Sequence, residues 1–210
     1  KLKNKLYIHF TKYADYVVCV SKIVYLNLYK KQVSNLIYIP NWANSEFHSA
    51  KRKPMKNGLY NILIASRLDK MKGHLVLFDA CKNLKNIQIH VVGSGPSEKE
   101  FIEYSKNLNV VFHGYQEDVT PYYQSCNLLV HPSFSEGGNP LSILEGLAVG
   151  IPTIGSDIPA IREILGGKYV FKKDSVTELR DKILELKSNK ENKQKYKLAN
   201  NQFKYFEIIN

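Results

Sequence analysis

Short runs of apolar residues alternate along the chain with longer stretches in which apolar residues recur every three or four positions. The runs predict buried strands, and the stretches predict amphipathic helices. The expected strands are 36–39, 60–65, 87–92, 109–113, 127–131, 153–155 and 169–171. The expected helices are 21–31, 73–84, 97–108, 119–126, 140–149, 159–164, 176–187 and 190–205. This alternation indicates an α/β fold, in which a parallel sheet carries helices on both faces.

A Lys-rich stretch with few apolar residues, 44–58, interrupts the pattern and is typical of a boundary loop. We therefore expect two parts, a short N-terminal piece of residues 1–42 and a domain of residues 43–210. Open parallel sheets bind their ligands beyond the carboxyl ends of the strands. Binding residues are thus expected in the loops that follow the strands.

The segment 133–145, SFSEGGNPLSILE, leads from an expected strand through two glycines into a helix. Asn139 suits the N-cap of that helix and Pro140 suits its first position. A helix that begins in a glycine loop directs free backbone N–H groups at a place where an anion can bind. Glu136 and Glu145 flank this place, and their carboxylates suit the neutral hydroxyls of a sugar or ribose. The combination favours a sugar nucleotide.

Three other strand-to-helix loops could carry chemistry. In the segment 66–73, SRLDKMKG, Arg67 follows a strand and Lys72 precedes a helix, so both cations can converge on one phosphate group. The turn 93–96, GSGP, lacks the third glycine of the dinucleotide fingerprint, which favours a plain tight turn. Asp118 suits the N-cap of the helix that follows the turn 113–117.

The formal net charge of +11 would suit nucleic acid, an anionic membrane surface or phosphorylated ligands. A nucleic-acid-binding protein is disfavoured, because the chain has no recognition motif and few aromatic residues among its basic stretches. The remaining interpretations of the charge are a solvated basic face and attraction to a membrane surface. No apolar stretch approaches the length of a membrane span.

The cysteines and histidines do not have the spacing of a metal site. Three scattered cysteines are more typical of reduced core thiols in a cytosolic protein, and they are Cys19, Cys81 and Cys126. Three histidines beside expected strand ends or helix starts are assigned to packing or hydrogen bonding, and they are His74, His113 and His131. We expect Tyr122 and Tyr123 to pack against the sheet.

Taken together and in this order, these segments resemble the donor-binding half of the retaining glycosyltransferases of family 4. That family has the two-domain GT-B architecture, so the resemblance implies the Rossmann-like C-terminal half of a GT-B enzyme. In the family an acceptor-binding domain comes first, which implies that residues 1–42 are the tail end of such a domain and the interdomain connection. The matching segments are 14–21, 39–41, 67–68 with 72–73, 92–96, 111–114, 118–119 with 122–123, 132–146, and 150–154 with 161–164.

The resemblance assigns roles to individual residues. Arg67 and Lys72 match the pair that binds the donor diphosphate and stabilises it as a leaving group. Glu145 matches the carboxylate that accepts hydrogen bonds from the ribose, and Glu136 matches the one beside the reacting carbon of the sugar. The implied catalytic set is Glu136, Arg67 and Lys72. Further implied donor-binding positions are Gly114, Tyr115, Gly137, Gly138, Asn139, Pro140 and Leu141.

One departure affects these assignments. The family places its two glutamates eight positions apart, whereas Glu136 and Glu145 are nine apart. An extra residue in the loop 137–140 could absorb the difference and return Glu136 to the site. Otherwise the sugar contacts fall to the loop amides and to Asn139. Glycines at 137 and 138 are expected because a side chain there would push the ligand away.

The implied reaction is transfer of a hexose from a UDP- or GDP-sugar to a glycan or lipid-linked acceptor, with retention of anomeric configuration. The resemblance implies no tightly bound metal and no cofactor besides the donor. Polysaccharide biosynthesis in the cytoplasm is expected, with peripheral contact at the inner face of the membrane as an alternative. This chain alone should bind donor and be inactive. A noncatalytic nucleotide-sugar sensor is the competing function, and the presence of Arg67, Lys72 and Glu145 argues against it.

Overall fold

The computed structural model describes residues 9–11 and 13–188. Six parallel strands form one sheet in the order β5-β4-β3-β6-β7-β8. Their bounds are Tyr60–Ala65 (β3), Ile87–Val92 (β4), Val110–Phe112 (β5), Leu128–His131 (β6), Thr153–Ser156 (β7) and Val170–Phe171 (β8). The expected α/β fold with a parallel sheet is confirmed, and each of these strands lies within two residues of its expected ends.

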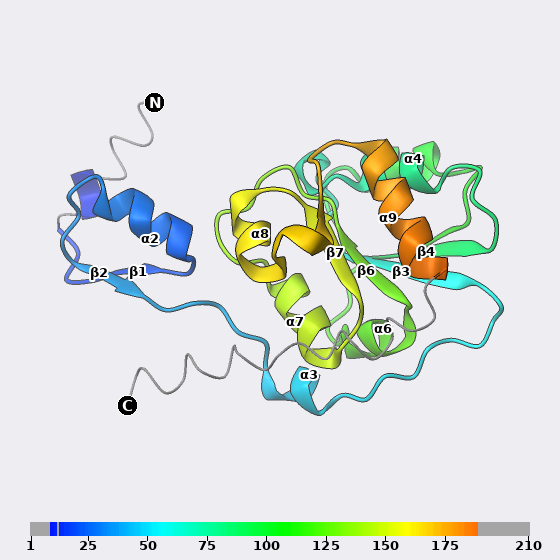
Figure 1. The fold of residues 1–210 in the computed structure, drawn as a ribbon, viewed down its shortest axis with the longest axis horizontal. Coiled ribbons are helices and arrows are strands. Elements are labelled where there is room, and N and C mark those ends of the chain that lie inside the picture. The colour runs from blue at the N-terminus through cyan, green and yellow to red at the C-terminus, as the bar shows by residue number, and fades with distance from the viewer. Residues whose placement is uncertain (1–8, 12, 189–210) are drawn as a thin grey trace.

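The sheet is covered on both faces, because alternate residues of the central strands point in opposite directions. Ile62 and Ile64 of β3 pack on the side of α4, α5 and α9, whereas Leu63 packs on the side of α6 and α7. Figure 1 shows α4 and α9 on one side of the sheet and α6 and α7 on the other. The helices of this domain are His74–Cys81 (α4), Glu98–Tyr104 (α5), Thr120–Ser125 (α6), Leu141–Val149 (α7), Pro159–Leu165 (α8) and Val176–Ser188 (α9). Two 3₁₀ turns complete it, η1 (Lys70–Lys72) and η2 (Gly167–Tyr169).

Chain direction across the sheet reverses between β3 and β6. From β3 the chain builds outward through β4 to β5, and from β6 it builds outward the other way through β7 to β8. The loops after β3 and β6 therefore leave the sheet side by side and turn to opposite faces. A crevice at such a reversal is where open α/β sheets bind ligands.

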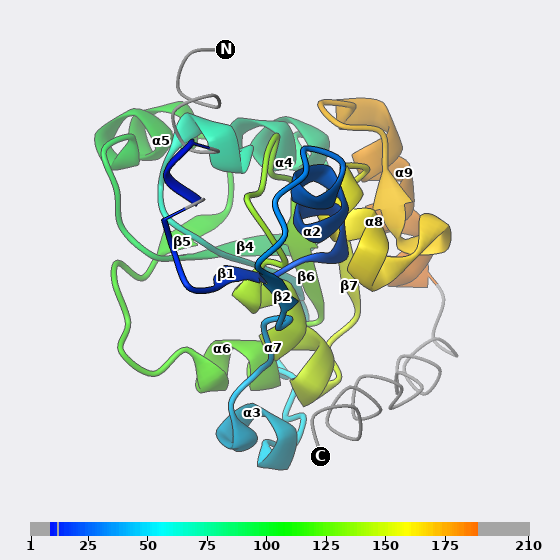
Figure 2. The same ribbon diagram turned by 90° about the vertical axis from the view of Figure 1, so that its left-hand side faces the viewer.

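The N-terminal part forms its own small βαβ unit. β1 (Val17–Cys19) pairs in parallel with β2 (Leu36–Tyr38), and α2 (Lys22–Tyr29) connects them. Figure 1 shows this unit beside the larger domain, and Figure 2 shows it in front of the ends of β6 and β7. The assignment of residues 1–42 to the tail of another domain stays a prediction.

Two local expectations differ from the structure, and a third lies outside the described residues. β1 was not expected as a strand, and it forms because β2 supplies its hydrogen-bonding partner. A one-turn helix, α3 (Ser45–Ser49), forms inside the expected loop because it buries Phe47 against the ring of Tyr123, 5.8 Å away between centroids. The expected helix at 190–205 lies outside the described residues. In the part of the chain that the structure describes, no helix is both long and apolar enough to cross a membrane.

The three cysteines are buried and free, as expected for core thiols. Cys19 lies in the small core of the N-terminal unit, whereas Cys81 and Cys126 lie in the two clusters that flank the sheet. Burial raises the pKa of the Cys81 and Cys126 thiols to about 12. Both thiols are therefore protonated and unreactive at neutral pH.

Candidate functional site

Hydrogen bonds to a backbone carbonyl join the loop after β3 to the loop after β6. The carbonyl of Met71, in η1, accepts hydrogen bonds from the Phe134 N–H at 2.8 Å and the Ser133 hydroxyl at 3.2 Å. Gly73 ends the turn at φ +72°, and a Cβ built there would lie 2.0 Å from the carbonyl oxygen of Pro132. Only glycine permits this approach, which places Lys72 beside the segment that carries Glu136.

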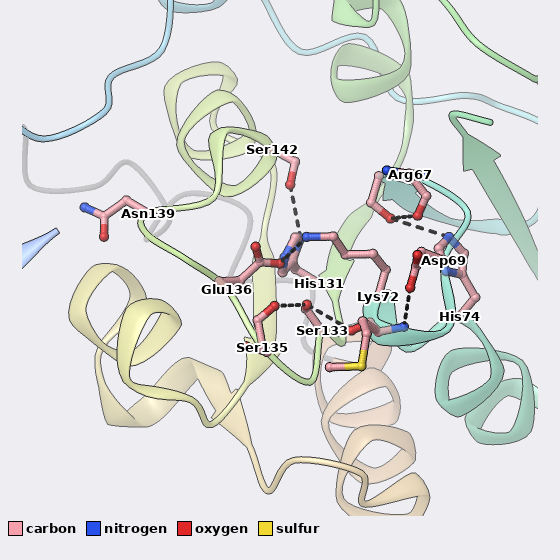
Figure 3. Close-up of polar contacts among 12 residues, drawn as sticks. Arg67, Asp69, Lys72, His74, His131, Ser133, Ser135, Glu136, Asn139 and Ser142 are labelled. Carbon is pink, nitrogen blue, oxygen red and sulfur yellow. Dashed lines mark hydrogen bonds and ion pairs between the residues drawn. The ribbon is translucent and has the colours of Figure 1, made fainter. Parts of the chain in front are cut away.

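Lys72 and Glu136 meet where these two loops leave the sheet (Figure 3). The Lys72 Nζ lies 2.7 Å from the Glu136 Oε1, and His131 Nε2 lies 2.8 Å from the same oxygen. The side chain of Glu136 is 11% exposed and that of His131 is 5% exposed. The other ring nitrogen of His131, Nδ1, lies 3.1 Å from the hydroxyl of Ser142 in the first turn of α7.

The environment of Glu136 keeps its carboxylate ionised. Burial alone would raise the pKa of this carboxyl group. Hydrogen bonds from His131, Lys72 and Ser133, together with the electrostatic contribution of His131, outweigh burial and lower the pKa to about 2. At neutral pH Glu136 is therefore an anion and cannot act as a proton donor. Its chemistry is that of a hydrogen-bond acceptor and a stabiliser of positive charge.

Despite the nine-position spacing, the carboxylate of Glu136 points inward to Lys72, and its contact with a sugar stays a prediction. The side chain of Asn139 extends away from this cluster (Figure 3). Its backbone carbonyl accepts a hydrogen bond from Asn41 at 2.9 Å, and its buried Oδ1 has no partner among the described residues. The structure thus brings Glu136 to Lys72 and leaves Asn139 turned toward the N-terminal unit.

The expectation that Asn139 caps α7 is wrong. The helix starts at Leu141, so Pro140 occupies the N-cap position and no side chain caps the helix. Pro140 adopts an extended backbone conformation there, which shifts the start by one residue. A Cβ on Gly138 would lie 2.5 Å from Cγ2 of Val20, whereas one on Gly137 would meet open space, and the expected approach of a ligand to these glycines stays a prediction.

Arg67 follows β3 on an exposed loop, and within the described residues its guanidinium makes no hydrogen bond or ion pair. The glycine turn after β4 supports this loop. A Cβ on Gly93, at φ +130°, would lie 2.1 Å from the Ser66 carbonyl oxygen, and one on Gly95 would lie 2.4 Å from that of Leu68. The glycines of this segment allow the two loops to touch, and its assignment as a plain tight turn stays a prediction.

Glu145 lies in the second turn of α7, where its Oε2 accepts a hydrogen bond from the Tyr123 hydroxyl at 2.8 Å. Burial raises the pKa of Glu145, while the Tyr123 hydrogen bond opposes the rise and Glu46 adds to it. Tyr123 itself is fully buried, as expected for a tyrosine that packs against the sheet. A hydrogen bond from Tyr123 of α6 therefore positions the carboxylate of Glu145. The contact of Glu145 with a ribose stays a prediction.

Gly114 and Tyr115 follow β5, at the edge of the sheet and outside the Lys72–Glu136 cluster. The carbonyl of Gly114 accepts a hydrogen bond from Gly93 at 2.8 Å, so the turns after β4 and β5 are joined. Tyr115 is largely exposed. Beneath this turn His113 contacts His90 at 3.0 Å between ring nitrogens, which bears out its assignment to hydrogen bonding.

Residues 60–189 match the protein family described as "Glycosyl transferases group 1". This chain belongs to that family. Among curated relatives, it is 33% identical over 128 residues to protein CapJ of Staphylococcus aureus, a match that covers 56% of this chain and 32% of CapJ. It is 24% identical over 151 residues to the amylovoran biosynthesis glycosyltransferase AmsK of Erwinia amylovora, covering 65% of this chain and 36% of AmsK. The chain thus spans about a third of the length of these curated relatives.

Solved structures of glycosyltransferases share the fold. TarM of S. aureus superposes with a TM-score of 0.82 at 21% identity, over 94% of this chain and 42% of TarM. HepE of Anabaena gives a TM-score of 0.78 at 16% identity, over 90% of this chain and 59% of HepE. The expected Rossmann-like half of a GT-B glycosyltransferase is confirmed as a fold. The finer assignment to the retaining family 4 stays a prediction.

Sequence reasoning missed the contacts of two members of the Lys72–Glu136 cluster. His131 was expected to make hydrogen bonds, which is confirmed, but its partners Glu136 and Ser142 were not foreseen. The available signal was its place as the last residue of β6, at the end of the sheet where ligands bind. Ser142 gave no signal, because a serine in the first turn of a helix is common.

Proposed function

We propose that this chain is the donor-binding part of a retaining glycosyltransferase that takes its sugar from a nucleoside diphosphate sugar. The observation that carries the proposal is the meeting of Lys72 and Glu136 at the reversal point between β3 and β6. A cation for a diphosphate and an ionised carboxylate for a sugar then lie at the ligand edge of the sheet. HepE has been solved with UDP-glucose, and TarM with UDP, which supports a UDP-sugar as donor.

The diphosphate would bind between the loop after β3 and the start of α7. Arg67 supplies a guanidinium without a partner in the described part of the chain, and Lys72 supplies a half-buried ammonium. The N-terminus of α7 adds a positive field equivalent to about half a unit charge. These groups would supply the positive field in place of a metal, which makes the proposed transfer metal-independent.

The proposed reaction is a front-side displacement. The bond between the anomeric carbon and the diphosphate breaks while the acceptor oxygen bonds to the same face of that carbon and passes its proton to the departing diphosphate, so configuration is retained. Arg67 and Lys72 stabilise the charge that develops on the departing diphosphate. The ionised Glu136 stabilises the positive charge that develops at the anomeric carbon. Glu145 accepts hydrogen bonds from the ribose, and the loops at Gly114–Tyr115 and at Gly137–Leu141 complete the donor contacts.

We propose a glycan or lipid-linked acceptor, bound outside this chain by an acceptor domain. One relative, 26% identical over 162 residues, is a Campylobacter jejuni transferase whose name describes a sugar carried on diphospho-undecaprenol. AmsK is named for polysaccharide biosynthesis. We therefore place the enzyme in the cytoplasm, with peripheral contact at the inner face of the membrane.

Calorimetric titration of this chain with UDP, GDP, dTDP and their common sugar conjugates tests the donor site. Selective binding that weakens about tenfold or more in Glu145→Ala supports the proposal. Glu103→Ala, which removes an exposed carboxylate on α5, is the matched control and should bind like the parent chain. If no ligand binds at millimolar concentration, the proposal that this chain binds the donor is wrong, and a scaffold role is favoured.

Product analysis tests the remaining parts of the proposal. In the complete enzyme the anomeric configuration of the new linkage, determined by NMR, should match that of the donor. The chain of 210 residues alone should transfer no sugar. An inverted product would overturn the front-side mechanism, and robust transfer by this chain would overturn the need for a separate acceptor domain.

A further inference from the structure

His131 lies at the centre of the polar cluster, yet the proposed function gives it no part. It is the last residue of β6, is almost fully buried, and uses both ring nitrogens. Nε2 contacts Glu136 Oε1 at 2.8 Å, and Nδ1 contacts the Ser142 hydroxyl at 3.1 Å. A histidine that only filled space would not require two polar partners from two different segments.

The direction of these hydrogen bonds follows from the partners. An ionised carboxylate can only accept, so Nε2 of His131 carries the hydrogen that Glu136 receives. In the neutral ring Nδ1 then accepts, and the Ser142 hydroxyl donates to it. Ser142 belongs to the first turn of α7. The imidazole therefore links the carboxylate of Glu136 to the helix whose N-terminus would face the diphosphate.

Lys72 and His131 share one carboxylate oxygen, Oε1, and Oε2 takes no part in either contact (Figure 3). In the proposed function Lys72 turns to the donor diphosphate, which weakens its hold on Glu136. His131 is the partner that can keep its contact, because its ring is buried at a strand end and has few ways to move. It would then hold Oε1 while Oε2 faces the sugar.

We propose that His131 is a positioning residue, whose Nε2–H orients the carboxylate of Glu136 toward the transferred sugar and whose Nδ1 ties that orientation to Ser142 on α7. The statement that the carboxylate faces the transferred sugar rests on the proposed function. The orientation of Glu136 by His131 does not, and it can be measured in the chain without any donor.

The first measurement is an NMR titration of the Glu136 side-chain carboxyl carbon in this chain. The groups that face this carboxylate are Lys72 from η1, His131 from β6 and Ser133 from the loop after β6. His131→Leu removes one charge-assisted hydrogen bond, so the midpoint of the titration should rise by about one pH unit. His131→Gln, whose amide N–H₂ reaches to about the place of Nε2, should titrate close to the parent chain.

Thermal unfolding of each variant verifies that it is folded under the titration conditions. A folded His131→Leu chain whose Glu136 titrates like the parent would overturn the proposal and leave His131 a packing residue. Ser142→Ala serves as the second variant, because it leaves the β6 strand intact and removes only the hydroxyl that donates to Nδ1. We expect it to raise the midpoint in the same direction by a smaller amount.

The second measurement compares the affinities of this chain for UDP and UDP-glucose, with GDP and GDP-mannose in parallel. In His131→Leu the affinity gained from the sugar should fall about tenfold, and His131→Gln should restore much of it. If none of these nucleotides binds to the parent chain, the proposed function fails, while the titration of Glu136 still decides the role of His131. If they bind and His131→Leu retains the full gain, the sugar-orienting role fails alone.

Discussion

Lys72 and Glu136 are 64 positions apart in the sequence and 2.7 Å apart between Nζ and Oε1. The pair is partly buried, so neither charge is fully solvated and each depends on the other. At the end of parallel strands, the Lys72 ammonium can exchange its carboxylate partner for a bound diphosphate, because the diphosphate offers it a second anion. The residues beside the Lys72–Glu136 pair determine the free energy that this exchange requires.

Removing the ammonium should affect the rate more than the fold. Lys72→Ala in the complete enzyme should lower kcat by ~10²–10³-fold, because one preorganised contact to the developing charge is lost. The measurement is steady-state kinetics with saturating donor. Lys70→Ala is the matched control, since Lys70 belongs to the same turn but is exposed and pairs with Glu100.

Arg67→Ala should lower kcat by a similar ~10²–10³-fold for the same reason. Because the guanidinium has no partner in the described part of the chain, its loss should leave the thermal midpoint of unfolding almost unchanged. Kinetics and calorimetric melting of the same preparation measure both quantities. Near-normal turnover in the Arg67 and Lys72 variants together would contradict a role in leaving-group stabilisation.

At the scale of elements, the site depends on how closely the loop after β3 approaches the loop after β6. Gly73 is one point of close approach, with its φ of +72° and a built Cβ only 2.0 Å from the Pro132 carbonyl oxygen. The glycine thereby serves two functions: it ends η1 and it lets α4 begin at the edge of the sheet. Helix and loop geometry here follow from a steric requirement at one residue.

Gly73→Ala should therefore destabilise the fold by more than a left-handed backbone alone explains. Gly58 provides the comparison, because it has nearly the same φ, +75°, and open space where a Cβ would be. Gly58→Ala should cost about 1–2 kcal/mol of unfolding free energy from the backbone conformation. Gly73→Ala should cost at least ~2 kcal/mol more, because the carbonyl of Pro132 must move. Urea unfolding measures both, and equal losses would show that the contact is not tight.

At the scale of the whole molecule, the N-terminal unit rests on the loop that carries Glu136. The backbone N–H of Lys22 donates to Glu163 at 3.1 Å, and Val20 contacts Gly138. Movement of the N-terminal unit would therefore displace the loop that carries Glu136. The contact with Val20 is a steric reason for glycine at 138 that the structure shows directly.

A substitution at this contact should show coupling between the two parts. Gly138→Ala should destabilise the chain by about 1–3 kcal/mol, because the new methyl group overpacks the contact with Val20. In a Val20→Ala background the same substitution should cost much less. Thermal and urea unfolding of the four chains give the coupling energy. Additive losses would mean that the N-terminal unit does not rest on Gly138 in solution.

The pH dependence of stability is also a property of the whole domain. Burial lowers the pKa of His74 to about 4, mainly through desolvation, against an ordinary value of 6.5. The unfolded chain therefore binds a proton at His74 before the folded chain does, and stability is lost as the pH falls from about 6.5 to about 4. The loss from this residue should approach about 3 kcal/mol at pH 4.

His74→Phe should reduce this loss, because the ring stacks on Phe101 and a phenyl group can take its place. Urea unfolding at pH 7 and pH 5 measures the slope, in a range above the titration of Glu136. Ile102→Ala, on an exposed residue that does not titrate, is the control and should retain the parent slope. An unchanged slope in His74→Phe would show that other groups dominate the acid sensitivity.

The sequence by itself determined the strands and helices of the six-stranded sheet to within a few residues. Apolar periodicity records which side of each element is buried, and that information is local to the element. It also indicated the loops that matter, because ligand sites of parallel sheets lie at the carboxyl ends of strands. It missed β1 and α3, whose formation depends on a partner strand and on a buried ring.

Tertiary structure alone decided which of these loop residues meet. The nine-position spacing left Glu136 either inside or outside the site, and the structure brings it to Lys72 and His131. It also turned Asn139 away from them, toward Asn41. The physical reason is that hydrogen bonds and ion pairs form between atoms a few ångströms apart, and that proximity arises from the packing of β3 beside β6. Local pattern carries no record of that distance.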